Sequence, residues 1–206
     1  MKRGRLISFE GIDRSGKSLQ AKRLADWLGE QGQPCLLTFE PGSSDIGKQL
    51  RKMLLDKELV RQPLTCALLF AADRHEHVKS RIEPALAAGK WVICDRFRDS
   101  TLAYQGGQGI DEKILEQLND LACEGLQPDL SLLMRISPQT SLQRHGDNDY
   151  FETGDCDYMQ QVAANYDRLA TSHQQRFAVL DGEQPPDLIT ELVRKTVIER
   201  FNEIGK

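Results

Sequence analysis

Residues 5–18 read Arg-Leu-Ile-Ser-Phe-Glu-Gly-Ile-Asp-Arg-Ser-Gly-Lys-Ser, and this stretch decides the fold. Its first part is an apolar run of strand length, and its second part matches the pattern Gly-x-x-x-x-Gly-Lys-Ser. Glycine at two positions of the loop permits backbone turns that are closed to other residues. The amide groups of such a loop, together with the start of the following helix, surround a phosphate. The stretch therefore predicts a strand, a nucleotide-phosphate loop and a helix, in that order.

The loop residues have distinct predicted roles. Lys17 is a point charge for the β- and γ-phosphates of ATP, and the Ser18 hydroxyl is a ligand for Mg²⁺. Asp95 closes a short apolar run and would meet the loop at the carboxyl edge of a parallel sheet, where it is the second predicted metal residue, acting through water. The residues predicted to bind ATP in the loop are Gly11, Ile12, Asp13, Arg14, Ser15, Gly16, Lys17, Ser18 and Leu19.

Short apolar runs alternate with longer amphipathic stretches along the chain. Strands are expected at 5–9, 35–39, 91–94, 130–134 and 177–180, and helices at 17–30, 46–55, 64–81, 111–123, 158–174 and 186–203. Strands separated by helices indicate a five-stranded parallel sheet covered by helices on both faces, which is an α/β architecture. We expect one domain over residues 1–206, with an excursion at about 145–157.

Composition excludes several classes of protein. The 206 residues include 27 basic and 31 acidic side chains, and the apolar runs are too short for a signal peptide or a membrane span. Residues 1–103 carry 18 basic and 13 acidic side chains, whereas residues 104–206 carry 9 and 18. An acidic chain without a basic cluster argues against nucleic-acid binding. Five scattered cysteines without Cys-x-x-Cys spacing indicate neither a disulfide framework nor a zinc site, and are typical of a reducing, cytoplasmic compartment.

The order of several motifs resembles the thymidylate kinase family, a group of P-loop nucleoside monophosphate kinases. The resemblance extends from about Gly4 to Tyr166. It is carried by five segments, which are Phe9-Glu-Gly-Ile-Asp-Arg-Ser-Gly-Lys-Ser18, Glu40-Pro-Gly42 with Ile46-Gly-x-x-x-Arg51, Leu69-Phe-Ala-Ala-Asp-Arg74, Asp95-Arg-Phe-x-x-Ser-x-x-Ala-Tyr-Gln105 and Pro128-Asp-Leu130. The resemblance implies a P-loop kinase fold and transfer of the γ-phosphoryl group of ATP to dTMP, with ADP and dTDP as products, in dTTP biosynthesis. It also implies a homodimer.

The resemblance further assigns the dTMP site. Phe70 would stack on thymine, Arg74 would donate hydrogen bonds to a thymine carbonyl and Gln105 would read the same base. Arg51 and Arg96 would hold the dTMP phosphate, because a guanidinium fork suits a phosphate. The remaining members are Asp13 at the sugar, with Ser100 and Tyr104 lining the pocket. The implied catalytic set is Asp13, Arg14, Lys17 and Arg96.

The family supplies a cation to the transferred phosphoryl group either from the P-loop or from the lid. Residues 145–157 contain no Lys or Arg and five acids, so Arg14 is the first candidate and Arg144, just before the lid, is the second. Arg144 is also predicted to bind ATP. Two alternatives remain for the whole chain. One is a kinase for another pyrimidine monophosphate such as dUMP, and the other is a nucleotide sensor without catalytic activity. His75 and His77 are interpreted as surface residues.

Overall fold

The computed structural model describes residues 3–56, 58–59, 62–144 and 156–201. The predicted lid at 145–157 lies almost entirely outside the described residues. The strands of the described chain are β1 (Leu6–Glu10), β2 (Cys35–Phe39), β3 (Trp91–Asp95), β4 (Leu130–Arg135) and β5 (Phe177–Asp181). The helices are α1 (Lys17–Glu30), α2 (Asp45–Leu55), α3 (Pro63–His77), a π-helical turn η1 (Val78–Ile82), α4 (Glu83–Ala87), α5 (Arg98–Gly107), α6 (Glu112–Cys123), α7 (Pro138–Gln143), α8 (Cys156–Ser172) and α9 (Pro186–Arg200).

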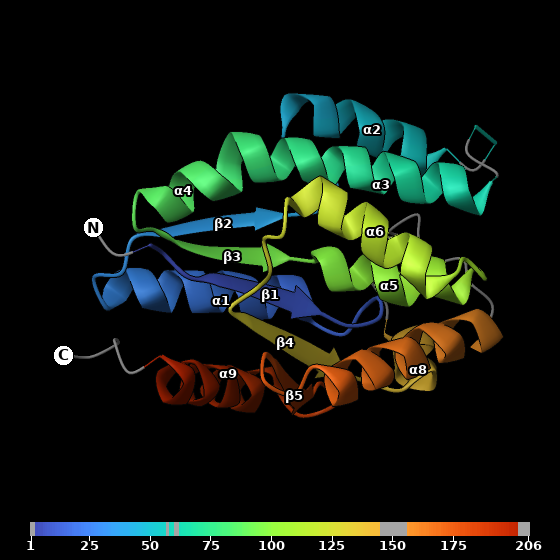
Figure 1. Ribbon diagram of the computed structural model, residues 1–206. Helices are drawn as coiled ribbons and strands as arrows, with labels where there is room; N and C mark the ends of the chain where they lie inside the picture. Colours follow the sequence, from blue (N-terminus) through green and yellow to red (C-terminus); the bar gives the residue numbers. More distant parts are fainter. Residues whose placement is uncertain (1–2, 57, 60–61, 145–155, 202–206) are drawn as a thin grey trace.

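The described strands form one five-stranded parallel sheet, which confirms the predicted α/β class (Figure 1). The strand order is β2-β3-β1-β4-β5, so β1 lies in the centre. Leu6 of β1 pairs with Val92 of β3, and Ile7 pairs with Leu130 of β4. The carboxyl ends of β1, β2 and β3 therefore meet at one edge, where the phosphate loop begins.

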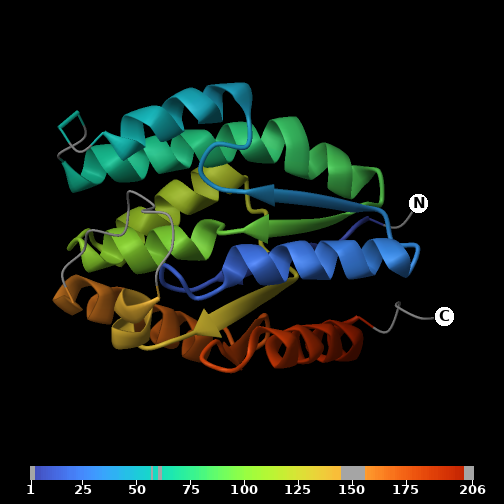
Figure 2. The same cartoon turned by 180° about the vertical axis from the view of Figure 1, so that it is seen from behind.

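Successive side chains of each strand point to opposite faces of the sheet, and apolar side chains occur on both faces. Helices therefore cover both faces. On one face, Ile7 and Phe9 of β1 pack with Leu24 and Leu28 of α1 and with Val193 of α9. Figure 2 shows α1 crossing in front of the sheet from this side. On the other face lie η1 and α4 over β1 and β3, and α5, α6 and α8 over β4. Helix α2 packs on α3 as an outer element.

The structure differs from the expected elements in two places. The stretch 64–81 was expected to be one α-helix, but it passes into the π-helical turn η1 before α4. Pro84 lies in the first turn of α4 and has no N–H to donate to the preceding turn, which breaks the α-helical ladder there. The second difference is a pair of helices, α5 and the short α7, that the periodicity of the sequence did not indicate. No helix of the described chain combines the length and the apolar character that a membrane span needs.

Candidate active site

A cleft of about 1400 Å³ runs along the carboxyl edge of the sheet. It extends from the turn after β5, at 182–186, past the phosphate loop to the facing sides of α3 and α5. The predicted site residues that line it are Asp13, Arg14, Ser15, Gly16, Lys17, Ser18, Leu19, Arg51, Phe70, Arg74, Asp95, Arg96, Ser100, Tyr104, Gln105 and Arg144. Gly11 and Ile12 line a smaller cavity behind the loop instead, and the Ile12 side chain belongs to the core. The cleft therefore joins segments from both halves of the chain.

The backbone of the phosphate loop is held in an uncommon conformation. Gly11 has a φ of 137°, and a Cβ at this position would lie 2.6 Å from the carbonyl oxygen of Met134. Arg14 has a φ of 59°, in the left-handed region that residues with a Cβ seldom adopt. Strained backbone of this kind persists where the surrounding structure fixes it, and it is concentrated at functional sites.

Lys17 is buried at the floor of the loop. Its Nζ donates to the carbonyl oxygen of Ile12 at 2.7 Å and to the hydroxyl of Ser15 at 3.3 Å. Burial, reinforced by the positive charge of Arg96, lowers the pKa of Lys17 to about 8. A nearby polyphosphate would favour the protonated form, so this ammonium is matched to a strongly anionic ligand.

Ser18 and Asp95, the two residues predicted to bind Mg²⁺, are in direct contact. The Ser18 hydroxyl, on the first turn of α1, donates to Oδ2 of Asp95 at the end of β3. The second carboxylate oxygen, Oδ1, is covered and has no hydrogen-bond partner within the described chain. A hydroxyl beside a carboxylate with an unused oxygen is a donor set that suits a hard divalent cation such as Mg²⁺.

Arg96 lies between the phosphate loop and the α5 side of the cleft. Its Nη2 contacts the carboxylate of Asp13 and lies 3.2 Å from the hydroxyl of Tyr104, while its Nη1 donates to the carbonyl oxygen of Gly11 at 3.3 Å. The Tyr104 hydroxyl donates to the same Asp13 oxygen at 3.0 Å. Burial raises the pKa of Tyr104 well above its ordinary value, so the phenol keeps its proton. Arg96 has a positive φ of 66°, as Arg14 has.

The remaining residues predicted to bind dTMP come from α2, α3 and α5. Arg51 is half-buried and donates to the carbonyl oxygen of Pro41 at 3.0 Å. Phe70 is half-buried on the wall of the cleft, and Gln105 of α5 is buried and lines the same cleft. Ser100 lines the cleft too, and its hydroxyl donates to Glu10 at 2.7 Å.

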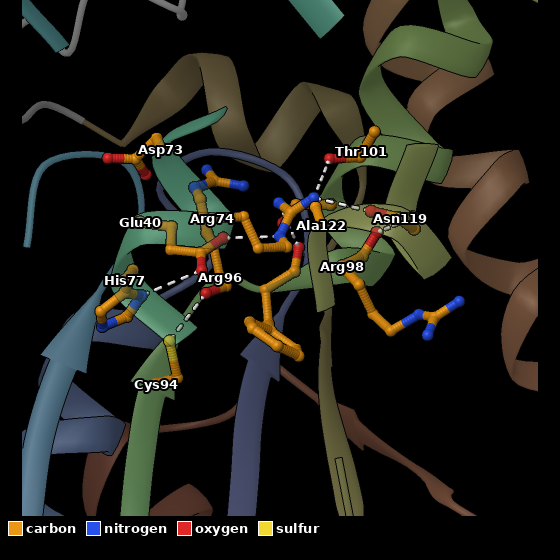
Figure 3. A network of polar contacts seen from close by, with 12 residues as sticks. Glu40, Asp73, Arg74, His77, Cys94, Arg96, Arg98, Thr101, Asn119 and Ala122 are labelled. Carbon is orange, nitrogen blue, oxygen red and sulfur yellow. Dashed lines mark hydrogen bonds and ion pairs between the residues drawn. The ribbon is translucent and has the colours of Figure 1, made fainter. Parts of the chain in front are cut away.

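Arg74 is only 2% exposed, and its guanidinium forms four hydrogen bonds within the protein (Figure 3). Nε donates to Glu40 at 2.8 Å, and Nη1 donates to the side-chain oxygens of Thr101 at 2.8 Å and Asn119 at 2.7 Å. Nη2 donates to the carbonyl oxygen of Phe97 at 3.2 Å. Arg74 therefore borders the cleft as a firmly held group and not as a solvated side chain.

Arg144 lines the cleft and contacts the backbone of the phosphate loop. Its Nη1 donates to the carbonyl oxygen of Arg14 at 3.0 Å, and its Nη2 donates to that of Gly182 at 2.7 Å. Both outer nitrogens therefore bind backbone that borders the nucleotide end of the cleft. The acidic stretch that follows Arg144, residues 145–155, is outside the described residues.

Glu10 is a polar residue at the site to which sequence reasoning gave no role. It is fully buried at the end of β1 and accepts from the backbone N–H of Phe97 at 3.0 Å, from Ser100 at 2.7 Å and from Tyr166 at 3.3 Å. Burial, with the negative charge of Asp99, raises the pKa of Glu10 to about 7. The signal was present in the sequence, since an acid directly before the glycine of a phosphate loop interrupts an otherwise apolar strand.

The interpretation of both histidines as surface residues was wrong for His77. This side chain is fully buried, with Nδ1 3.0 Å from Glu40 and Nε2 2.7 Å from the hydroxyl of Thr38. His75 is exposed, and its Nδ1 lies 3.2 Å from the carbonyl oxygen of Ala122.

Glu40, His77 and Cys94 offer three possible metal-ligand atoms within 4.8 Å of one another. The two Glu40 oxygens already accept from Arg74 and His77, and the Cys94 thiol donates to the carbonyl oxygen of Arg96 at 3.0 Å. A guanidinium beside the cluster opposes a second cation. The geometry therefore fits a polar network better than a metal centre.

Comparison with known proteins adds independent findings. The sequence model of the family described as "Thymidylate kinase" matches residues 9–193. A protein named thymidylate kinase from Maridesulfovibrio salexigens is 40% identical over 207 residues, which cover 95% of each chain. One of the same name from Synechococcus sp. strain RCC307 is 41% identical over 207 residues, covering 96% of this chain and 97% of its own. The crystal structure of thymidylate kinase from Ehrlichia chaffeensis superposes with a TM-score of 0.79 at 32% identity, covering 95% of this chain and 99% of that one.

Proposed function

The chain belongs to the thymidylate kinase family and phosphorylates dTMP with ATP, and from this premise we propose how its own residues divide that work. The observation that carries the proposal is the single cleft that joins the phosphate loop to the α3 and α5 wall. The donor occupies the loop end, the acceptor occupies the α3 and α5 end, and Arg96 lies where the two phosphates meet. The acceptor phosphate is already ionised near neutral pH, so positioning and charge neutralisation supply the catalysis.

At the donor end, the loop amides and Lys17 bind the β- and γ-phosphates of ATP. Arg14 stabilises the phosphoryl group in transfer, as an arginine supplied by the loop itself. This choice over Arg144 is supported by the contacts of Arg144, whose Nη1 and Nη2 bind the carbonyl oxygens of Arg14 and Gly182. Arg144 thus holds the loop that presents Arg14.

Ser18 and Asp95 would hold the Mg²⁺ ion, Ser18 directly and Asp95 through water. Bound there, the ion would supply neutralisation of charge on the β- and γ-phosphates. The support is the contact of the two side chains and the unused Oδ1 of Asp95. Ser18 on α1 and Asp95 at the end of β3 thus provide two metal-ligand groups at the place where these elements meet.

At the acceptor end, Arg96 and Arg51 bind the dTMP phosphate, and Asp13 orients Arg96 while meeting the sugar. Phe70 stacks on thymine. These roles are supported by the positions of the side chains on the cleft and by the Arg96–Asp13 ion pair. Tyr104 holds Asp13 through its hydroxyl and lies beside the sugar.

Arg74 and Gln105 recognise the base. Four of the five N–H groups of Arg74 are used inside the protein, and the fifth, on Nη2, has no partner within the described residues. We assign this N–H to a thymine carbonyl, because a site with fixed donors penalises a base that leaves them unpaired. Ser100 forms part of the wall of this pocket, and its hydrogen bond to Glu10 holds its side chain in place.

The Arg14 assignment is tested by Arg14→Ala in rapid-quench single turnovers with ATP and dTMP. We expect the rate of transfer to fall by about 10³-fold while the Kd of ATP changes by less than about tenfold, because the contact strengthens in the transition state. Arg135→Ala, which removes an exposed arginine paired with Asp167 away from this cleft, is the matched control. Near-normal transfer in Arg14→Ala, with a large loss in Arg144→Ala, would move the role to Arg144.

Acceptor choice is tested on the same protein with dTMP and dUMP. We expect kcat/KM to be higher for dTMP, since Phe70 and the buried wall beside it contact the methylated ring. A higher value for dUMP would contradict the proposed base site.

We propose that the chain acts as a homodimer. Support comes from an apolar stripe on α3 and α6, two helices that pack together on the outside of the sheet. Leu64 and Leu68 of α3 are about half exposed, and Leu121 of α6 is 76% exposed. Ile114 and Leu121 are seven residues apart, so they lie on one side of α6.

We further propose a single domain over residues 1–206, with a lid at about 145–157, acting in the cytoplasm. The domain assignment is supported by the one sheet to which all the described strands belong. The compartment is supported by the ATP requirement and by the five cysteines, which are free thiols. Cell fractionation of a tagged chain tests the compartment.

A further inference from the structure

Glu40 connects the base-reading arginine to the rest of the protein. It lies directly after β2, it is 5% exposed, and its two oxygens have different partners (Figure 3). Oε2 accepts from Nε of Arg74 at 2.8 Å, and Oε1 accepts from Nδ1 of His77 at 3.0 Å. The backbone N–H of Glu40 donates to the carbonyl oxygen of Asp95 at 3.0 Å. The carboxylate cannot turn without breaking one of these contacts.

His77 fixes the second oxygen of Glu40. A carboxylate that is ion-paired with an arginine only accepts, so Nδ1 of His77 carries the proton in this contact. The opposite nitrogen, Nε2, lies 2.7 Å from the hydroxyl of Thr38, two residues before Glu40 on β2. His77 follows Arg74 by three residues, so both project from neighbouring positions of α3. The imidazole ring thus links the strand to the helix that presents the arginine.

The direction of Arg74 depends on this linkage. Its guanidinium is planar, so a rotation that breaks the Nε bond to Glu40 also moves Nη2. Thr101 and Asn119 hold Nη1, and the carbonyl oxygen of Phe97 accepts from one N–H of Nη2. The contact of Nε with Glu40 adds the remaining constraint on the plane of the guanidinium, and the His77 bond in turn keeps Glu40 in place.

We propose that Glu40 and His77, with Thr38 behind them, are positioning residues that set the Nη2 donor of Arg74 for a carbonyl of the pyrimidine base. The inference rests on the proposed role of Arg74 as a reader of that carbonyl. It assigns acceptor selectivity to a relay of three side chains that act through Arg74, although Thr38 and Glu40 also line the cleft.

His77→Leu tests the relay, because leucine has a similar volume and cannot donate to Glu40. The measurement is kcat and KM for dTMP and for 5-methyl-dCMP, in which an amino group replaces the carbonyl that Arg74 would meet. We expect the KM of dTMP to rise about tenfold and the preference for dTMP over 5-methyl-dCMP to fall by a similar factor, with the KM of ATP unchanged. His77→Asn, which places an amide N–H near the position of Nδ1, should restore most of both values.

Two further variants keep the test decisive if His77→Leu does not fold. Thr38→Val leaves Nε2 of His77 without its hydroxyl partner, and we expect it to raise the KM of dTMP while Thr38→Ser does not. His75→Leu is the matched control, since it makes the same change on the same helix outside the network. Values within twofold of the original protein for both His77→Leu and Thr38→Val would overturn the relay.

Arg74→Lys separates the relay from the role on which it rests. Lysine keeps a positive charge beside Glu40 but has no Nη2 donor. If this variant keeps the original preference for dTMP over 5-methyl-dCMP, Arg74 does not read the carbonyl, and both proposals fall. If it loses the preference while His77→Leu and Thr38→Val keep it, the relay alone is wrong.

Discussion

At the scale of single residues, Arg14 combines a proposed catalytic charge with a strained backbone. Its φ of 59° is a conformation that costs a residue with a Cβ roughly 1–2 kcal/mol, whereas glycine adopts it freely. The side chain that we propose for catalysis is thus attached at a position where the backbone would favour glycine.

Replacement of Arg14 by glycine and by alanine should separate these two properties. Both variants lose the guanidinium, so we expect the same large loss of kcat in each. Arg14→Gly should nevertheless have a free energy of unfolding about 1 kcal/mol higher than Arg14→Ala, measured by urea denaturation. Equal stability of the two variants would mean that the backbone at this position is relaxed.

Lys17 should make nucleotide affinity depend on pH. Its pKa of about 8 in the free protein means that the ammonium is lost as the pH rises through 8, whereas polyphosphate binds the protonated form. We expect the Kd of ADP to increase by up to tenfold per pH unit between about pH 8 and 9.5, with one proton taken up on binding. Calorimetry in buffers of different ionisation enthalpy measures both quantities. Lys17→Met should bind weakly without this dependence, and a constant Kd over the range would contradict the assignment.

At the scale of elements, the start of α5 is stabilised from another part of the chain. Phe97 precedes the helix and provides no side-chain cap, whereas Glu10 of β1 accepts from its N–H and from the hydroxyl of Ser100. Helix α5 carries Tyr104 and Gln105, so the Glu10 carboxylate connects the strand before the phosphate loop to the wall of the proposed acceptor site.

The raised pKa of Glu10 predicts a stability change between pH 5 and 8. With a pKa of about 7 in the folded state and an ordinary value of 4.5 in the unfolded state, the folded chain holds a proton that the unfolded chain has lost. This contribution is complete below about pH 4.5 and disappears as the pH rises through 7. Glu10→Gln should remove it, so that the variant loses less stability over this range, by an amount on the order of 1–3 kcal/mol. Urea denaturation at several pH values measures the difference.

Glu183 provides the matched control for Glu10. Its pKa is lowered to about 2 by the backbone N–H of Ser137 and by the hydroxyl of Thr140, so it titrates below the tested range. Glu183→Gln should leave the slope between pH 5 and 8 unchanged. A slope for Glu10→Gln identical to that of the original protein would show that Glu10 keeps its ordinary pKa.

Comparison of expected and observed elements shows which physical signals the sequence carries. Strands buried on both faces and helices with one apolar side were recognised because their patterns have a clear period. Helix α5 was missed because Arg98 to Gln105 are all buried, so no apolar side contrasts with a polar one. The burial of Arg74 and His77 could not be predicted either, since their partners Glu40, Thr38 and Asn119 come from distant parts of the chain.

At the scale of the whole molecule, the α3 and α6 stripe predicts the state of association. Leu121→Lys places a charge on the most exposed of its leucines, so we expect a dimer to become a monomer at micromolar concentration. Size-exclusion chromatography with light scattering measures the mass. Leu188→Lys makes the same change on α9, where the leucine is 41% exposed on the opposite side of the sheet, and should not alter the mass. Equal masses for both variants would place the interface elsewhere.

The order of strands also has a consequence for how the chain acquires its structure. The first strand is the central one, and its two neighbours begin at Trp91 and Leu130, long after the phosphate loop has been synthesised. A chain that ends before Trp91 has no strand with which β1 can pair in the native order. Contacts of such large sequence separation form late, because the loop between them must first be closed. The loop that defines the enzyme is thus among the first parts to leave the ribosome, yet it has its native support only when more than half of the chain has followed.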